Sequence, residues 1–416
     1  MDAQGWIERT EAAARDRDDP LAPLRDTFLL PEGLIYLDGN SLGPLPRAVA
    51  ARIDRVVSRE WGNDLIRSWN TNEWIDLPFR VGARIAPLIG AKSHEVVVAD
   101  STSINLFKLL ASALSLRPGR STILSEAGNF PTDIYVAEGL SSFSNDRWRL
   151  RQAPATDLHD ALDDDVGVVM LTHVDYRTGR MHDMDAMTKA AHDHGALMLW
   201  DLSHSTGAVP VDLDSAGVDF AIGCGYKYLN GGPGAPSFLY VAERWHDAFS
   251  QPLTGWLGHA DPFAFEGSYR PASGVARALC GTPPVLSLSA LDAALDVWRS
   301  VELAAVRAKS LRLGDLFIAQ IEPHAEALDL KLATPRAAEL RGSQVSYHHP
   351  QGHAAMQALI AEGVIGDFRT PDIMRFGFAP LYVRYVDVWD AAERLIDVLR
   401  SGRWRNPEFQ KRSKVT

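Results

Sequence analysis

Short apolar runs separated by amphipathic stretches dominate the chain between about residue 95 and residue 225. The runs lie at residues 96–98, 122–124, 168–171, 196–200 and 220–222. They are almost continuously apolar, without the alternation of a half-exposed strand, which is typical of strands buried on both faces of a parallel sheet. The pattern therefore predicts an α/β fold in which helices cover a large, mostly parallel central sheet.

One strand, helix, strand unit of this region can be followed closely. Between the runs ending at residues 171 and 200 lie an N-cap residue, apolar residues at helical spacing and a glycine that favours a stop: Asp183, Met184, Met187, Ala191 and Gly195. The unit places Thr172 and Asp201 at the carboxyl ends of two strands. Open α/β sheets bind their ligands at that edge.

The two ends of the chain have a different pattern. Residues 1–30 predict a polar helical arm, followed by a short strand at 34–37 and a turn at 38–41. After about residue 283 the chain predicts a long helical stretch, a second helix and a few short strands, at residues 286–321, 354–362, 330–333, 344–347 and 374–378. Helices segregated from a few strands indicate a smaller α+β domain.

The length of the chain indicates more than one hydrophobic core, because single cores stop growing near 250 to 300 residues and this chain has 416. We expect residues 1–40 to form an arm associated with the small domain. Residues 41–283 should form the large ligand-binding domain, and residues 284–416 the small domain.

Charge and cysteine content exclude several kinds of function. The formal net charge is −11 and no Lys/Arg block stands out, so neither nucleic acid nor an anionic membrane is an expected partner. The two cysteines, Cys224 and Cys280, form neither a disulfide framework nor a zinc-binding spacing. The first residues lack the apolar centre of a signal peptide, and no apolar run approaches the ~20 residues of a membrane span. We expect a cytoplasmic enzyme that acts on a small molecule and binds no metal.

Asp201 and Lys227, 26 residues apart, are the strongest candidates for chemistry. Asp201 ends a buried run, and a buried carboxylate without a cationic partner is costly or becomes protonated. A protonated pyridine nitrogen would satisfy it. Lys227 lies between two tyrosines before a glycine-rich loop, where desolvation would lower its pKa and free its amine to form an imine. Together they indicate an enzyme that uses pyridoxal 5′-phosphate (PLP).

Simpler interpretations exist for each residue. An aspartate after a strand often caps a helix, and a lysine before glycines is often solvated. A Ser203, His204 and Asp201 triad is disfavoured, because there is no G-x-S-x-G elbow and such close neighbours rarely form one. The glycine loop at 231–234 lacks the G-K-[ST] ending of a P-loop. His192 and His194 lie on different helix faces and are not expected to share a metal.

Seven segments spread in order along nearly the whole chain resemble the kynureninase family, within the class V, aspartate-aminotransferase-like group of PLP enzymes. They are YLDGNSLG (36–43), STSINL (101–106), NFPTD (129–133), WDLSH (200–204), YKYLNGGPG (226–234), GWLGH (255–259) and MRFGFAPLY (374–382). The resemblance implies the PLP-dependent transferase fold type I and a homodimer with shared active sites.

The family's residue roles carry over to matching positions of this chain. The resemblance implies that Lys227 forms the Schiff base with PLP and that Asp201 pairs with the pyridine nitrogen. The implied phosphate contacts are Thr102, Ser103 and Tyr226, with Trp256 and Thr282 from a neighbouring subunit. Phe130 would stack on the cofactor ring, and Asp133, Thr172 and His204 would line it. Arg375 would bind the substrate's α-carboxylate.

The implied reaction is hydrolysis of the Cβ–Cγ bond of L-kynurenine to anthranilate and L-alanine, a step of tryptophan catabolism by the kynurenine pathway, which can also feed NAD biosynthesis. Lys227 would remove the α-proton and Tyr226 would donate protons later. Trp69, Gly281 and Thr282 match the bacterial pattern, which favours L-kynurenine over 3-hydroxykynurenine. Turnover of both is expected, because an apolar wall discriminates one hydroxyl by only about 1–3 kcal/mol.

Two alternatives remain at this stage. The first is another class V reaction, by an aminotransferase or a cysteine-desulfurase-type lyase; a desulfurase would need a mobile, exposed cysteine. The second is a catalytically silent relative kept as a binding module. Silent relatives usually lose the lysine, whereas Lys227, Asp201 and Arg375 are all present.

Overall fold

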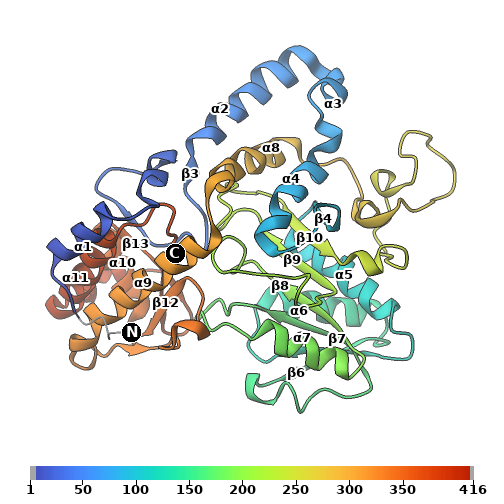
Figure 1. The fold of residues 1–416 in the computed structure, drawn as a ribbon. Coiled ribbons are helices and arrows are strands. Elements are labelled where there is room, and N and C mark those ends of the chain that lie inside the picture. The colour runs from blue at the N-terminus through green and yellow to red at the C-terminus, as the bar shows by residue number, and fades with distance from the viewer. Residues whose placement is uncertain (1–5, 413–416) are drawn as a thin grey trace.

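A seven-stranded sheet forms the centre of the larger part of the protein in the computed structural model, which describes residues 6–412 (Figure 1). Its strands, in spatial order, are β4 (Val96–Val98), β10 (Ser237–Val241), β9 (Phe220–Cys224), β8 (Leu197–Asp201), β7 (Val166–Thr172), β5 (Thr122–Glu126) and β6 (Arg149–Ala153). β10 pairs antiparallel with β4 and β9, and the remaining pairs are parallel. The predicted α/β fold with a mostly parallel sheet is confirmed.

The sheet is buried on both faces, which explains its unbroken apolar runs. In β7, Val169 and Leu171 point into one hydrophobic core, while Val168 and Met170 point into the other. Helices α4 (Leu77–Ile85), α5 (Thr102–Ser115), α6 (Pro131–Phe143), α7 (Met184–Asp193) and α8 (Val285–Ala294) belong to this part. The side chain of Asp183 caps α7 by accepting a hydrogen bond from the Ala186 N–H at 3.0 Å, as its sequence predicts.

A four-stranded antiparallel sheet organises the C-terminal part, in the order β11 (Lys331–Leu332), β12 (Gln344–His348), β15 (Ile373–Gly377) and β14 (Asp367–Arg369). Its helices are α9 (Leu303–Ile321), α10 (Gly352–Ala361) and α11 (Tyr385–Ser401). The two sheets lie side by side in Figure 1, with the C-terminal part at the left. The domain boundaries at residues 40 and 283 stay a prediction.

The N-terminal arm packs on the C-terminal part. Its helix α1 (Arg9–Arg17) lies against α11, and the carboxylate of Asp16 accepts hydrogen bonds from the first two N–H groups of α11, Tyr385 at 2.7 Å and Val386 at 3.0 Å. Asp19 forms a buried ion pair with Lys309 of α9 at 2.7 Å. The arm that was predicted to be helical is only partly α-helical over the described residues, because a 3₁₀ turn (Ala22–Thr27) and β1 (Phe28–Leu29) follow α1. Residues 1–5 of that prediction lie outside the described residues.

The chain crosses between the two parts through short strands. β2 (Ile35–Tyr36) pairs in parallel with β13 (Val364–Ile365), and β1 pairs with β3 (Leu45–Pro46). From there α2 (Arg47–Arg55), the π-helical segment at Val56–Asp64 and α3 (Ser68–Thr71) project away from the body, at the top of Figure 1.

Two details of the predicted elements were wrong. The helical stretch predicted at 286–321 is interrupted, because Val301 adopts an extended backbone (φ −113°, ψ 119°) between the turn at Leu295–Ser300 and α9. In the central sheet, strands β6 and β10 were not predicted, and outside it the short strands β1, β3, β13 and β14 were not predicted. β6 is an edge strand with an arginine-rich sequence, so it lacks an apolar run. Among residues 6–412, no helix has both the length and the apolar character that crossing a membrane requires.

Candidate active site

The candidate site is built at the carboxyl ends of β7 and β8. Thr172 and Asp201 are direct partners in the parallel register of these strands, and both are buried. The Asp201 carboxylate accepts a hydrogen bond from the backbone N–H of Ser203 at 2.8 Å, so the loop after β8 fixes its orientation. The structure thus confirms that these two residues end neighbouring strands.

A second buried carboxyl group faces Asp201. Asp133, in the first turn of α6, is 3% exposed. The Thr172 hydroxyl contacts the Asn129 side-chain oxygen at 2.5 Å and Asp133 Oδ2 at 3.3 Å. Burial, and then the charge and hydrogen bond of Asp201, raise the pKa of Asp133 well above its ordinary value. The raised pKa favours the protonated form of Asp133, and its hydrogen bond with Asp201 joins the two carboxyl groups.

Lys227 lies in the loop after β9. Its Nζ is 6.0 Å from the ring centroid of Phe130 and 5.9 Å from that of Tyr226. The N–H of Gly43 donates to the Tyr226 carbonyl at 2.8 Å, and a Cβ on Gly43 would collide with the carbonyl oxygen of Lys227. The turn after β2 can therefore approach the lysine loop only with glycine at this position.

Tyr226 and His204 complete the polar surroundings of Lys227. The pKa of Tyr226 is raised by the neighbouring Cys224, by burial and by the charge of Asp201. Burial, with the charges of Lys227 and Arg375, lowers the pKa of His204 well below its usual value. The tyrosine thus keeps its proton and the histidine stays neutral, and the buried Nδ1 of His204 has no hydrogen-bond partner.

Arg375, on β15, reaches this region from the C-terminal part and is 1% exposed. Its Nη1 donates to the Tyr176 carbonyl at 2.5 Å, and its Nη2 donates to Ser41 Oγ at 3.0 Å. It also forms an ion pair with Asp367 of β14, its partner in the strand register. Its Nε is buried without a hydrogen-bond partner, so one donor of the guanidinium is free for a ligand.

Thr102 and Ser103 open α5, a fourteen-residue helix. The Ser101 side chain caps it by accepting from the Ile104 N–H at 3.4 Å. The side chains of Thr102 and Ser103 are half-buried at the helix N-terminus, where free N–H groups and the helix dipole favour an anion such as phosphate.

For four predicted residues, the structure of residues 6–412 shows no hydrogen bond, ion pair or ring contact with the Lys227 cluster. Trp69 packs on Trp74, with ring centroids 6.0 Å apart, and Trp256 packs on Phe263 at 5.6 Å. Gly281 and Thr282 are exposed. In the part of the chain that the structure describes, no hydrogen bond or ion pair links these four to Lys227 or Asp201. Their predicted roles include contacts from a second subunit, and these roles stay predictions.

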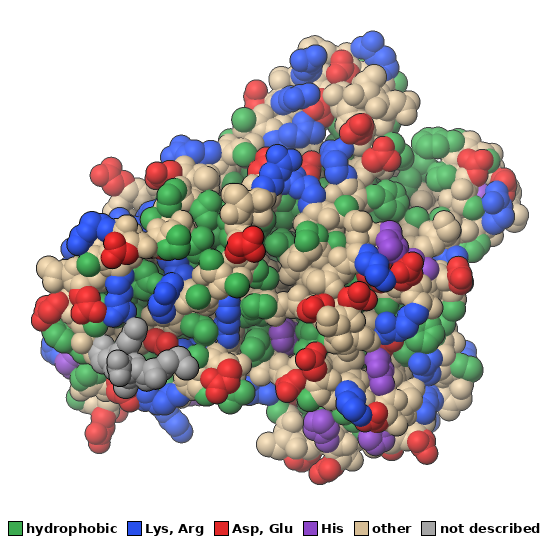
Figure 2. Space-filling model, viewed as in Figure 1, with side chains coloured by type: hydrophobic (Ala, Val, Ile, Leu, Met, Phe, Trp, Pro, Cys, Tyr) green, Lys and Arg blue, Asp and Glu red, His purple; other side chains and the backbone are tan. Residues whose placement is uncertain are grey.

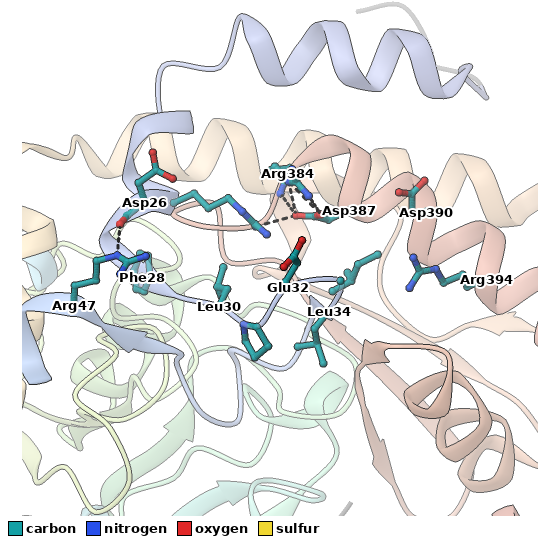
Figure 3. Close-up of a pocket in the computed structure, with 14 residues that line it drawn as sticks. Asp26, Phe28, Leu30, Glu32, Leu34, Arg47, Arg384, Asp387, Asp390 and Arg394 are labelled. Atoms are coloured by element: carbon teal, nitrogen blue, oxygen red, sulfur yellow. Dashed lines mark hydrogen bonds and ion pairs between the residues drawn. The ribbon is translucent and has the colours of Figure 1, made fainter.

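A cavity beside the N-terminal arm is not this site. It has a volume of about 470 Å³ and lies between the N-terminal segment and α11 (Figure 3). Several of its charged groups already have partners: Arg384 pairs with Asp387 at 2.7 Å, and Arg47 donates to the backbone carbonyl of Asp26 at 2.8 Å. None of the predicted site residues lines it.

The donor set around Lys227 fits PLP. A buried carboxylate suits a pyridinium nitrogen, a half-buried lysine amine suits an aldehyde, and an aromatic face and a helix N-terminus suit the ring and the phosphate. The unpartnered Nδ1 of His204 and Nε of Arg375 leave polar groups for bound molecules. Fold and site together define a PLP-dependent enzyme of fold type I.

Solved structures of this fold are similar over most of the chain. A cysteine desulfurase from Thermococcus onnurineus NA1 matches with a TM-score of 0.75 and 19% identity, covering 91% of this chain and 98% of the other. A C-DES variant with glycine covalently linked to its PLP cofactor matches with a TM-score of 0.79 and 17% identity, covering 90% and 99%. At these identities the likeness shows the fold alone.

Sequence relatives give the family. A kynureninase of Burkholderia pseudomallei (strain K96243) is 57% identical over 98% of this chain and 99% of its own length, and one of Pseudomonas fluorescens is 53% identical over the same shares. Residues 306–395 match the family model described as the kynureninase C-terminal domain. The chain belongs to the kynureninase family, and it is a PLP-dependent hydrolase that acts on a carbon–carbon bond. The alternatives of a desulfurase, an aminotransferase or a silent binding module are not favoured.

The structure also adds residues that the sequence did not single out as site residues. Asn129 contacts the Thr172 hydroxyl, and Ser41 and Asp367 contact Arg375. Asn129 and Ser41 fall within two of the family-like segments, so a signal existed for them. Asp367 had none, because only the pairing of β14 with β15 brings it to Arg375.

Proposed function

We propose that this chain hydrolyses the Cβ–Cγ bond of L-kynurenine to anthranilate and L-alanine, with Lys227, Asp201, Tyr226 and Arg375 as the residues that carry the reaction. One observation supports this most strongly. The amine of Lys227, in the loop after β9, lies 6.0 Å from the ring centroid of Phe130, and the buried Asp201 ends the neighbouring strand β8.

PLP, when bound, supplies an electron-poor ring that accepts the charge left when the α-proton of the substrate is removed. Asp201 would hold the pyridine nitrogen, and Asp133, by donating its proton to Asp201, would hold that carboxylate in place. Phe130 would lie on the ring, and Thr172 and His204 would line it. Thr102, Ser103 and Tyr226 would bind the phosphate.

The protein groups would then move protons at defined atoms. Once it is no longer bonded to the cofactor, the Nζ of Lys227 would remove the α-proton of the substrate. It would later donate that proton to the cofactor. The Tyr226 hydroxyl is a suited donor for the later steps, because its raised pKa keeps it protonated at neutral pH. His204 stays neutral beside Lys227, so it adds no positive charge that would oppose protonation of the lysine.

Arg375 would bind the substrate's α-carboxylate. A guanidinium binds a carboxylate through two parallel N–H donors, and the buried, unpartnered Nε lies on the same edge as Nη2. In the structure, the Nη2 donor of that edge already contacts Ser41 and Asp367.

A homodimer with shared active sites is the proposed assembly. Large apolar side chains are exposed on the projecting segment from α2 to α3, at Trp61 (57%) and Ile66 (77%), and on the loop segment that follows β10, at Phe263 (61%) and Phe265 (76%). Figure 2 shows hydrophobic side chains on the flank between these two segments. A second copy covering this surface would bring Trp256 and Thr282 to the phosphate and Trp69, Gly281 and Thr282 to the substrate.

We also propose that the enzyme is cytoplasmic and prefers L-kynurenine.

The proposed reaction is tested by incubating the PLP-loaded enzyme with L-kynurenine, with and without pyruvate. We expect anthranilate and L-alanine in equal amounts, independent of pyruvate. An aminotransferase would need the keto acid and would release a transaminated product. No anthranilate from a PLP-loaded sample would overturn the proposal.

A further inference from the structure

A cluster of buried and half-buried charged and polar side chains surrounds Arg375, and the proposed reaction does not use most of it. The cluster consists of Asp38, Ser41, Asp367, Arg369 and Arg375. Three separate segments build it: the turn after β2, the strand β14 and the strand β15. Asp367 and Arg375 are 2% and 1% exposed, so the charges interact with little screening by water.

Asp367 holds one edge of Arg375. Its Oδ2 forms the ion pair with Arg375 Nη2, pairs with Arg369 Nη2 at 2.7 Å and accepts from Ser41 Oγ at 3.0 Å. Its Oδ1 accepts from the Phe368 N–H at 2.6 Å. These donors fix the orientation of the carboxylate, and it lies on the edge of the guanidinium that an incoming carboxylate needs.

Asp38 is the member of the cluster without a complete set of partners. Its buried Oδ1 has no hydrogen-bond partner. Burial and the charge of Asp367 raise the pKa of Asp38 to about 6, against the lowering effect of Ser41, Arg375 and Arg369. Two arginines therefore balance two carboxylates near neutral pH, and a further carboxylate would leave an uncompensated negative charge.

We propose that Asp38 and Asp367 are positioning residues for Arg375: Asp367 holds the guanidinium until a carboxylate ligand arrives, and Asp38 takes up one proton when that carboxylate binds. The inference rests on the proposed role of Arg375 in binding the substrate's carboxylate. The proton comes from solvent and forms an O–H bond on Asp38, which restores the balance of charge in the cluster.

The other titratable groups that face the cluster keep one state across this range of pH. The pKa of each neighbouring tyrosine, Tyr36, Tyr228 and Tyr382, is raised, mainly by burial, so all three stay neutral. His204 feels the charges of Arg375 and Arg369 and also stays neutral. Asp38 is thus the group that can take up a proton when a new negative charge arrives near neutral pH.

The test uses 4-(2-aminophenyl)-4-oxobutanoate, which is kynurenine without its α-amino group and cannot form an imine. Titration calorimetry of the PLP-loaded enzyme at pH 7, in two buffers of different ionisation enthalpy, counts the protons taken up. For the wild type we expect measurable proton uptake for each probe molecule bound. The Kd of the probe should rise with pH above pH 6, by up to about tenfold per pH unit. In Asp38→Asn the uptake should vanish and Kd should no longer depend on pH.

Two further variants separate the possible outcomes. Asp372→Asn, on the turn between β14 and β15 and paired with His348 instead, should keep the wild-type uptake. Arg375→Lys should weaken probe binding at least about tenfold, because the bidentate fork is lost. If Arg375→Lys binds the probe normally, the proposed role of Arg375 fails. If Arg375→Lys loses binding but the wild type takes up no proton, or Asp38→Asn takes up as many as the wild type, the inference alone is overturned.

Asp367→Asn tests the second half of the proposal. Without the competing carboxylate the probe should bind more tightly, by about tenfold, while kcat for L-kynurenine falls because Arg375 is no longer held in one orientation. Weaker binding of the probe in this variant would contradict the competition between Asp367 and the ligand.

Discussion

Thr172 and Asp201 are direct register partners at the carboxyl ends of β7 and β8, and the Thr172 hydroxyl reaches on to Asp133 at 3.3 Å. Two strands and the start of α6 thus hold a pair of buried carboxyl groups in fixed positions. Only one member of this pair, Asp201, is proposed to face the cofactor as an anion. The two carboxyl groups therefore have different expected responses to the same substitution.

Asp201→Asn should lower kcat by about 10²–10³-fold, because it removes a preorganised charge from the site. Asp133→Asn should cost at most about tenfold, since the pKa of Asp133 is raised well above its ordinary value and an amide resembles a protonated carboxyl. Steady-state anthranilate formation by the two PLP-loaded variants checks this. An equal loss in both would contradict the assignment of the proton to Asp133.

A shared active site predicts recovery of activity in mixed dimers. Lys227→Ala and Trp256→Ala should each be impaired. After the two are unfolded together and refolded, half the dimers are hybrids, and each has one site with both native residues, so activity should return to about a quarter of wild type. If Trp256 instead serves the site of its own chain, every site in a hybrid carries one substitution and no activity returns.

Asp219 should contribute strongly to stability above pH 4. It is 1% exposed and accepts from Met198 N–H and His192 Nε2, each at 2.8 Å, and from Trp245 Nε1 at 2.7 Å. Burial alone would raise its pKa, but these donors lower it below 3.8. Asp219→Asn should cost about 2–4 kcal/mol, measured by denaturant unfolding.

The pH dependence of that loss follows from the sign of the shift. A carboxylate with a depressed folded-state pKa contributes its full stability above the unfolded value of 3.8 and loses it as the pH falls through the lower folded value. The difference between wild type and Asp219→Asn should therefore be constant from pH 8 to pH 5 and shrink below pH 4. The exposed Asp193, on the same helix as His192, offers a control: Asp193→Asn should leave the free energy of unfolding unchanged within the error of the measurement.

Substrate preference should be modest. The residues proposed to face the aromatic ring, Trp69, Gly281 and Thr282, offer little polarity for a 3-hydroxyl group. The ratio of kcat/KM for L-kynurenine over 3-hydroxykynurenine should favour L-kynurenine by about 10- to 200-fold. A preference for the hydroxylated substrate would show that these residues do not form the wall of the pocket.

The central sheet and the strand ends could be predicted because burial leaves a direct mark on sequence. Thr172 and Asp201 each follow an unbroken apolar run, and the run length fixes where the strand stops. β6 left no such mark, since an edge strand with Arg149 and Arg151 tolerates polar residues. The break at Val301 was missed because a single extended residue between two helical segments barely changes the apolar periodicity.

The site was predictable in part for the same reason. Lys227 and Asp201 lie next to glycines and a buried strand, so their setting is local and visible in the sequence. The ion pair between Asp367 and Arg375 depends on strand register across β14 and β15, and the contact of Gly43 with the Lys227 loop depends on tertiary packing. Trp256 and Thr282 would need a second chain, which no property of one chain's local sequence describes.

The most direct measurement of the central claim is anthranilate formation from L-kynurenine by wild type and Lys227→Ala, both incubated with PLP. Lys189→Ala, which removes an exposed lysine paired with Asp193, controls for loss of charge. We predict that Lys189→Ala keeps wild-type activity and that Lys227→Ala loses at least about 10³-fold in kcat, because the substitution removes the amine that is proposed to take the α-proton. Activity of Lys227→Ala within about tenfold of wild type would contradict the account.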